Sequence, residues 1–207
     1  MRQVTKSTRI PEKVLIALGS NANSQLGGSR KILTLGLVEL DGDDVSVLEV
    51  SRHFQTPCFP AGAGPDYVNA AAVLETTLSP TALMARLLEV EKTFGRMRVE
   101  RWGQRTLDID MIAYGGQTLP DAETVKFWMN IPLEEQKAQA PGQLIVPHPR
   151  VHERAFVLIP LSDIAPDWRH PVLGKTVREM TDALPEGEKS EVLTLPGMEE
   201  SAEVPCQ

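Results

Sequence analysis

The segment 107–112 (LDIDMI) constrains this chain most, because two aspartates alternate with apolar residues inside it. A two-residue alternation of this kind predicts a β-strand. Residues i and i+2 of a strand share a face, with Cα atoms about 6.5–7 Å apart, so Asp108 and Asp110 are expected side by side. Two like charges in an apolar segment repel each other and lose solvation unless a cation lies between them. Hard oxygen ligands suit Mg²⁺, which takes one or two protein carboxylates together with phosphate oxygens.

Four arginines lie just upstream of this segment, at positions 96, 98, 101 and 105. Guanidinium groups bind phosphate oxygens in bidentate geometry. Either feature alone is more often a solvated surface than a site. The aspartate pair and the arginines together predict a nucleotide polyphosphate site.

The composition is that of an ordinary soluble globular protein, 42% hydrophobic and 24% charged over 207 residues. The sequence contains no apolar run that approaches the ~20 residues of a membrane span and no secretory signal pattern. Cys58 and Cys206 lack metal-type spacing and favour reduced thiols in the cytoplasm. Most of the net charge of −7 lies in residues 185–207, which carry six glutamates and one lysine. A long basic stripe is missing, so no nucleic-acid partner is expected.

The order of the expected elements defines the fold class. Strands are expected at 13–19, 45–56, 67–76 and 107–112, and helices at 24–40 and from Ser79-Pro80 to about residue 94. The order β-α-β-β-α-β is the ferredoxin-like topology, a sandwich with a central antiparallel sheet, classed as α+β. Added C-terminal elements follow: a short edge strand at 145–147 and helices beginning near 152 and 175.

One domain is expected over residues 13–184, with a loose N-terminus before it. Residues 117–143 predict a surface insertion, because prolines interrupt it, with Phe127, Trp128 and Met129 against the body. The acidic residues 185–207 combine Glu, Pro and Gly with few large apolar groups, and predict a disordered tail. The protein is expected to be a monomer.

Two further groups of residues could bind ligands. Tyr67 and Asn69 share a strand face, and an aromatic plane beside a carboxamide suits a flat heterocycle. His148 and Arg154 could reach phosphate, and Phe156 could cover a ring. Each group alone is more often structural. The run 27–31 (GGSRK) lacks the spacing of a phosphate-binding loop.

These pieces, in this order, resemble the 6-hydroxymethyl-7,8-dihydropterin pyrophosphokinase family of folate biosynthesis. The resemblance covers about residues 13–180. It rests on ALGSN (17–21), TP (56–57) followed by DYVNAA (66–71), GRMR (95–98), ERWGQRTLDIDM (100–111), VPHPRVHERAF (146–156) and PLSDIAP (160–166). The segment 100–111 together with the downstream VPHP is highly specific.

The resemblance implies Mg²⁺-dependent transfer of pyrophosphate from ATP to the hydroxymethyl oxygen of the pterin, with release of AMP. It implies that Asp108 and Asp110 bind two Mg²⁺ and act in catalysis with Arg96 and Arg105. The family's ATP-binding positions match Glu91, Arg96, Arg98, Trp102, Arg105, His148 and Arg154. Its pterin-binding positions match Thr56, Pro57, Phe59, Tyr67, Asn69 and Phe156.

The chain departs from the family pattern in four places. Pro149 follows the matched histidine, at a position where an aromatic residue is common. The loop between Arg98 and Arg101 is about one residue shorter than in a common form of the family. Residues 117–143 replace a brief connection, and the acidic tail has no counterpart. Two alternatives compete with this interpretation: a non-catalytic module that binds pterin or nucleotide, and another metal-dependent enzyme such as a phosphodiester hydrolase. The complete set of matched Asp and Arg residues opposes the first. The aromatic pair and the lack of a His-rich cluster oppose the second.

Overall fold

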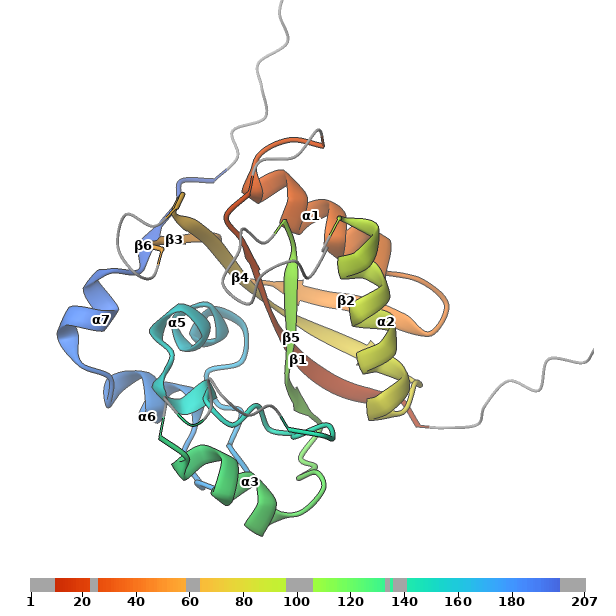
Figure 1. Ribbon diagram of the computed structural model, residues 1–207, viewed down its shortest axis with the longest axis vertical. Helices are drawn as coiled ribbons and strands as arrows, with labels where there is room; N and C mark the ends of the chain where they lie inside the picture. Colours follow the sequence, from red (N-terminus) through yellow and green to blue (C-terminus); the bar gives the residue numbers. More distant parts are fainter. Residues whose placement is uncertain are drawn as a thin grey trace, which may run out of the picture.

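A computed structural model gives the fold, and it describes residues 10–22, 26–58, 64–95, 106–132, 135 and 141–197. The strands pair antiparallel in the order β5-β1-β4-β3-β6, and β2 also pairs with β4 (Figure 1). The described strands are β1 (Glu12–Ser20), β2 (Val45–Val50), β3 (Phe54–Thr56), β4 (Tyr67–Thr76), β5 (Asp108–Tyr114) and β6 (Leu193–Thr194). Counting β2 and β3 as one interrupted strand, the order confirms the predicted β-α-β-β-α-β fold.

One face of the sheet is covered by α1 (Ser29–Leu40) and α2 (Pro80–Thr93) (Figure 1). Helix α2 begins as predicted, because the Ser79 hydroxyl accepts a hydrogen bond from the Ala82 amide and Pro80 occupies the first turn. The apolar side chains of both helices pack on inward-facing residues of the strands. The largest buried members of this core include Ile16, Leu18, Ile32, Leu33, Leu74, Leu83, Leu87 and Ile109.

The opposite face is covered by C-terminal helices. A 3₁₀ turn, η1 (Val151–Glu153), leads into α5 (Ala155–Ile164), and α6 (Val177–Asp182) packs beside α5. Their apolar side chains form a second core with the sheet, which includes Leu15, Ala17, Ala71, Val73, Ile112, Val157, Leu158, Leu161 and Val177. The predicted C-terminal helices therefore exist, and they complete the sandwich.

The strand predicted over 45–56 is interrupted between Ser51 and His53. The Ser51 hydroxyl accepts a hydrogen bond from the Ala71 amide (2.9 Å), and the Ser51 amide donates to the Ala71 carbonyl (2.9 Å). A side-chain oxygen thus takes the place of a backbone acceptor on the edge of β4. The register also shifts between Val47 and Glu49, so side chains before and after this point do not follow one alternation of faces.

The predicted insertion contains a helix, α3 (Ala122–Asn130), which lies outside the sheet (Figure 1). Its buried anchor is Val125, whereas Phe127 is 60% exposed, so the prediction that Phe127 packs against the body is wrong. Trp128 and Met129 are half-buried as expected. An isolated antiparallel bridge joins Leu119 to Val146, and it is all that forms of the edge strand predicted at 145–147.

The expected tail begins with regular structure, so the prediction of disorder is wrong for residues 186–194. Helix α7 (Glu186–Ser190) leads into β6, which pairs with β3. Residues 198–207 lie outside the described residues. The helices of the described part are too short or too polar to span a bilayer.

Candidate active site

The aspartate pair lies on β5, an edge strand of the described sheet. Asp108 and Asp110 are half-buried, whereas Ile109 between them is 1% exposed and faces the core under α1 and α2. Both carboxylates therefore project from the opposite face of the sheet, as the alternation predicts. The neighbouring strand β1 contributes only small residues there, because Gly19 pairs with Asp108 and Ala17 pairs with Asp110.

Glu91 fixes the beginning of this strand from the α2 side. Its side chain is 1% exposed, and Oε1 accepts a hydrogen bond from the Ile109 amide at 2.8 Å. An edge strand has backbone donors without a strand partner, and Glu91 supplies an acceptor for the donor between the two aspartates. This contact positions the aspartates. The predicted approach of Glu91 to a nucleotide stays a prediction.

Arg154 places a positive charge beside the pair. Its Nη1 lies 3.7 Å from Asp110 Oδ2, and its guanidinium lies 5.6 Å from the centre of the Phe156 ring. Burial lowers the pKa of Arg154, and the charge of Asp110 acts in the opposite direction. Because a guanidinium is very strongly basic, the side chain stays cationic. The structure thus brings together an acidic residue, a basic residue and an aromatic residue from the predicted set.

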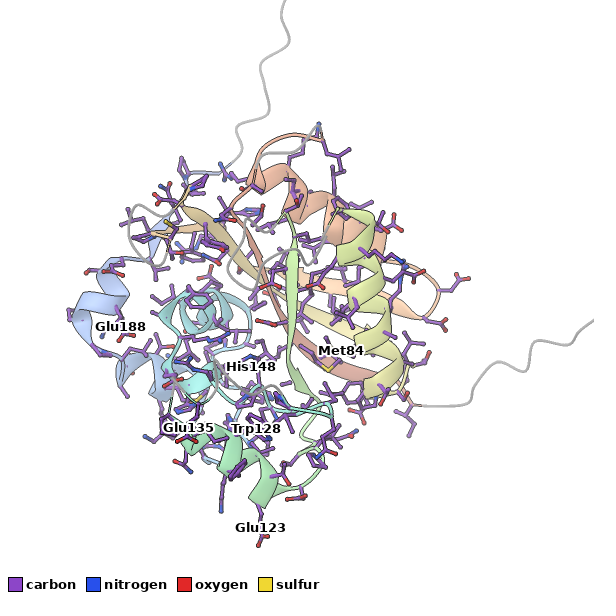
Figure 2. The ribbon with its side chains drawn as sticks, viewed as in Figure 1. Met84, Glu123, Trp128, Glu135, His148 and Glu188 are labelled. Atoms are coloured by element: carbon purple, nitrogen blue, oxygen red, sulfur yellow. The ribbon has the colours of Figure 1, made fainter. Side chains whose placement is uncertain are left out.

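His148 lies between α5 and β5 (Figure 2). Its amide donates to the Ile112 carbonyl (2.9 Å), and its Nδ1 accepts from the Arg150 amide (3.1 Å). Burial, with help from Arg154 and Arg150, lowers the pKa of His148 to about 3. The ring is therefore neutral near pH 7, and since Nδ1 accepts, the proton lies on Nε2. His148 can serve as a neutral hydrogen-bond donor.

Arg150 was not among the predicted residues, yet its amide sets the tautomer of His148 and its side chain pairs with Glu153. Its place within VPHPRVH was the only sequence signal.

A polar pair lies on β3 and β4. Asn69 Nδ2 donates to Thr56 Oγ1 at 2.9 Å, and both side chains are buried. This contact fixes the direction of the carboxamide. Tyr67, which pairs with Thr56 across the strands, is half-buried, and Pro57 next to Thr56 is exposed. These residues supply an aromatic plane beside fixed hydrogen-bonding groups, as the sequence predicts.

The acidic pair and the polar pair share one face of the sheet. Gly19 pairs with Asp108 on one side and with Asn69 on the other, and directly paired residues of antiparallel strands project from the same face. Two strand spacings separate the backbones of Asp108 and Asn69, about 9–10 Å. Phe156, 40% exposed, lies in the first turn of α5, which packs on this face.

Several predicted residues lie outside the described residues: Phe59, Arg96, Arg98, Arg101, Trp102 and Arg105. Within the described part, no cluster of three or more His, Cys, Asp or Glu side chains forms a metal site. The oxygen ligands of Asp108 and Asp110 do fit Mg²⁺, because this ion commonly binds one or two carboxylates and completes its shell with water and phosphate.

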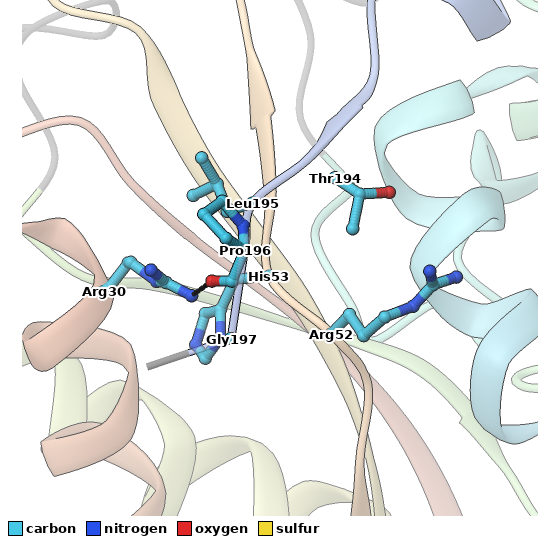
Figure 3. Close-up of a pocket in the computed structure, with 7 residues that line it drawn as sticks. All are labelled: Arg30, Arg52, His53, Thr194, Leu195, Pro196 and Gly197. Carbon is cyan, nitrogen blue, oxygen red and sulfur yellow. Dashed lines mark hydrogen bonds between the residues drawn. The ribbon is translucent and has the colours of Figure 1, made fainter. Parts of the chain in front are cut away.

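A separate pocket of about 440 Å³ lies between α1 and the C-terminal segment (Figure 3). Arg30 Nη2 donates to the Pro196 carbonyl there, and Arg52 forms a two-fold hydrogen bond with Asp163. The other lining residues are His53, Thr194, Leu195 and Gly197. None of the predicted site residues lines this pocket.

Fold and site together define an α+β protein of ferredoxin-like topology, in which Asp108, Asp110 and Asn69 share one sheet face and Arg154 lies beside Asp110. The family model described as 7,8-dihydro-6-hydroxymethylpterin-pyrophosphokinase (HPPK) matches residues 15–166. The chain belongs to this family.

Curated relatives support the assignment. Three proteins named 2-amino-4-hydroxy-6-hydroxymethyldihydropteridine pyrophosphokinase are similar to the chain. The Synechocystis sp. protein is 41% identical over 57% of this chain and 50% of its own length. The Pseudomonas aeruginosa protein is 35% identical over 84% and 93%, and the Methylorubrum extorquens protein is 33% identical over 81% and 90%. The match thus spans half of the first relative and about nine-tenths of the other two.

Among solved structures, a Plasmodium falciparum HPPK-DHPS crystallised with pteroate has a similar fold. The TM-score is 0.59 at 12% sequence identity, over 88% of this chain and 44% of that chain. A second structure, HPPK-DHPS in complex with substrates, gives a TM-score of 0.58 at 12% identity, over 84% and 43%. At this level of identity the likeness supports the fold.

Proposed function

We propose that the protein transfers the pyrophosphoryl group of ATP to the hydroxymethyl oxygen of 6-hydroxymethyl-7,8-dihydropterin, in folate biosynthesis. The observation that carries this proposal is the shared sheet face. Carboxylates suited to a metal–phosphate complex lie on β5, and the residues suited to ring binding lie two strand spacings away on β4. The oxygen of the hydroxymethyl group attacks the β-phosphorus, the bond from β-phosphorus to the α–β bridging oxygen breaks, and AMP leaves. The hydroxyl proton passes to solvent.

Asp108 and Asp110 would bind two Mg²⁺ ions, which supply charge neutralisation for the β- and γ-phosphates when they are bound. The pair is half-buried and lies beside the cationic Arg154. Transfer of phosphoryl groups depends mainly on positioning and charge stabilisation, so no strong base is required. Glu91 supports this arrangement because it fixes the backbone between the two carboxylates.

His148 and Arg154 would bind phosphate oxygens in different ways. Arg154 contributes a full charge, whereas neutral His148 contributes one directional N–H from Nε2. Arg96, Arg98, Trp102 and Arg105 complete the proposed nucleotide site by family resemblance. Arg96 and Arg105 would also act in catalysis.

The pterin would lie between the rings of Tyr67 and Phe156, with its polar edge toward Thr56 and Asn69 and near Pro57 and Phe59. The fixed carboxamide supports this role, because a buried polar group that is already oriented recognises a matching edge with little loss of conformational freedom. We also propose that the protein acts as a cytoplasmic monomer.

The nucleotide product tests the proposal. Purified protein is incubated with ATP and Mg²⁺, with and without the pterin, and the products are separated by chromatography. We expect AMP and pterin diphosphate in equal amounts, and only when the pterin is present. ADP as the main product, or equal ATP consumption without pterin, would contradict the proposal. Binding of both substrates without turnover would favour the non-catalytic module, and hydrolysis of a phosphodiester would favour the hydrolase.

A further inference from the structure

Gly19 lies in the middle of the row that joins the two halves of the proposed site. It is on β1, paired with Asp108 of β5 and with Asn69 of β4. A methyl group built on Gly19 would lie 3.3 Å from Asn69 Oδ1 and 3.9 Å from Tyr67 Cδ1. The first distance is tighter than an ordinary contact, so the carboxamide or the strand would have to move.

The backbone of Gly19 does not require glycine. Its φ lies outside the left-handed region, and glycine within a strand is less stable than alanine by about 0.5–1 kcal/mol. Gly36 gives an instructive contrast, because a Cβ there would lie 2.7 Å from Leu107 Cδ2 inside the core. Gly36 is explained by the packing of α1 on the sheet. At Gly19 the atom nearest to an added Cβ is instead the carboxamide oxygen of buried Asn69. The amide nitrogen of Asn69 already donates a hydrogen bond to Thr56.

We propose that Gly19 is a specificity-determining residue for the pterin, and this inference rests on the proposed function. The missing side chain leaves Asn69 Oδ1 in position to accept a hydrogen bond from the pterin edge. It also keeps the strip of sheet between Asn69 and Asp108 clear, so that the hydroxymethyl arm reaches the metal-bound phosphates. Ala17, in the next row between Asp110 and Ala71, is buried in the second core, where this strip ends.

The first test compares Gly19→Ala with the wild type and with Gly116→Ala, whose added Cβ would meet nothing within 4 Å. Calorimetric titration measures the affinity for the pterin in the presence of Mg²⁺ and a non-hydrolysable ATP analogue, and the affinity for the analogue alone. We expect Gly19→Ala to lose about tenfold or more in pterin affinity, the equivalent of one displaced hydrogen bond. Its affinity for the analogue and its melting temperature should not fall, and Gly116→Ala should match the wild type.

Equal pterin affinity in Gly19→Ala and the wild type would overturn this inference and leave the proposed function standing. A loss of melting temperature parallel to the loss of affinity would overturn it too, because it would show a structural role. Failure of the wild type to bind pterin would overturn both proposals.

A double-mutant cycle with Asn69→Ala tests the route of the effect. If Gly19 acts through the carboxamide, Gly19→Ala should change pterin affinity less than about twofold in the Asn69→Ala background. An undiminished tenfold loss in that background would contradict the proposed route.

Discussion

Asp108 and Asp110 are held in place by contacts that a metal ligand would require. Glu91 accepts from the amide between them, and Arg154 lies 3.7 Å from Asp110. Two carboxylates on one strand face repel each other, and a cation bound as proposed would relieve this repulsion.

Replacing either aspartate with alanine should abolish turnover without unfolding the protein. Metal-assisted charge stabilisation contributes several kcal/mol, so kcat should fall by at least ~10³-fold. The melting temperature should be maintained, since both side chains are half-exposed and removal of one relieves repulsion. Asp43→Ala, in an exposed turn, is the matched control. Near-normal activity in Asp108→Ala and Asp110→Ala would rule out the metal assignment.

We expect buried His170 to make the free energy of unfolding depend on pH. It is fully buried, its Nδ1 accepts hydrogen bonds from the Val172 and Leu173 amides, and burial lowers its pKa from 6.5 to about 4. The unfolded chain therefore binds a proton between pH 6.5 and about 4 that the folded chain does not. The contribution of neutral His170 is complete above pH 6.5 and is lost as the pH falls through this window.

Chemical denaturation between pH 7 and 4 measures this effect. The free energy of unfolding should fall with decreasing pH, and the fall should be shallower in His170→Asn. Parallel curves for the two proteins would show that His170 does not contribute. The pKa of His148 is also lowered, so His148 makes the free energy of unfolding fall in the same direction as the pH decreases. It does so equally in the wild type and in His170→Asn, so the difference between the two curves reports His170 alone.

At the scale of elements, β6 is the least expected part of the fold. It pairs with β3, the strand that ends at Thr56, and the Leu195 amide donates to the His53 carbonyl at 2.9 Å. Arg30 of α1 donates to the Pro196 carbonyl (Figure 3). The C-terminal segment thus ties α1 and β3 together next to the proposed pterin group.

A chain ending at residue 192 should be less stable and should bind pterin more weakly, because β3 becomes an unsupported edge strand. Loss of two or three hydrogen bonds predicts a decrease of about 1–3 kcal/mol in the free energy of unfolding. A chain ending at residue 197 keeps β6 and is the matched control, with unchanged affinity. Identical stability and pterin affinity in the two truncated chains would show that β6 has no supporting role.

The sequence predicts the strongly periodic elements and misses those decided by single contacts. The alternation in 107–112 was sufficient to predict β5, and Ser79-Pro80 was sufficient to predict the start of α2, because a local pattern determines each of them. The break near Ser51 depends on one hydroxyl that meets a distant amide. Strand β6 is two residues long within an acidic segment, so no period could reveal it. Phe127 is exposed although it is apolar, because Val125 faces the body in its place.

The candidate site shows the same division. The shared face of Asp108 and Asp110, and that of Tyr67 and Asn69, followed from the period of a strand. The two pairs lie on either side of Gly19 because of the order and register of the strands. The local sequence pattern of a single strand does not contain that information. The resemblance to a family supplied the missing connection.

At the scale of the molecule, the sheet separates two cores, and the candidate site lies where the second core ends. Helices α1 and α2 pack on one face, and α5 and α6 pack on the other (Figure 1). Arg154, at the N-terminal end of α5, lies 3.7 Å from Asp110 on β5 and beside the Phe156 ring.

The central claim is pyrophosphoryl transfer, and the fate of the two terminal phosphates of ATP tests it most directly. ATP labelled separately at the β- and γ-phosphorus is incubated with the protein, Mg²⁺ and the pterin. We predict that both labels enter the pterin product in a one-to-one ratio and that AMP carries neither. Transfer of the γ-label alone, with the β-label left on ADP, would contradict the account.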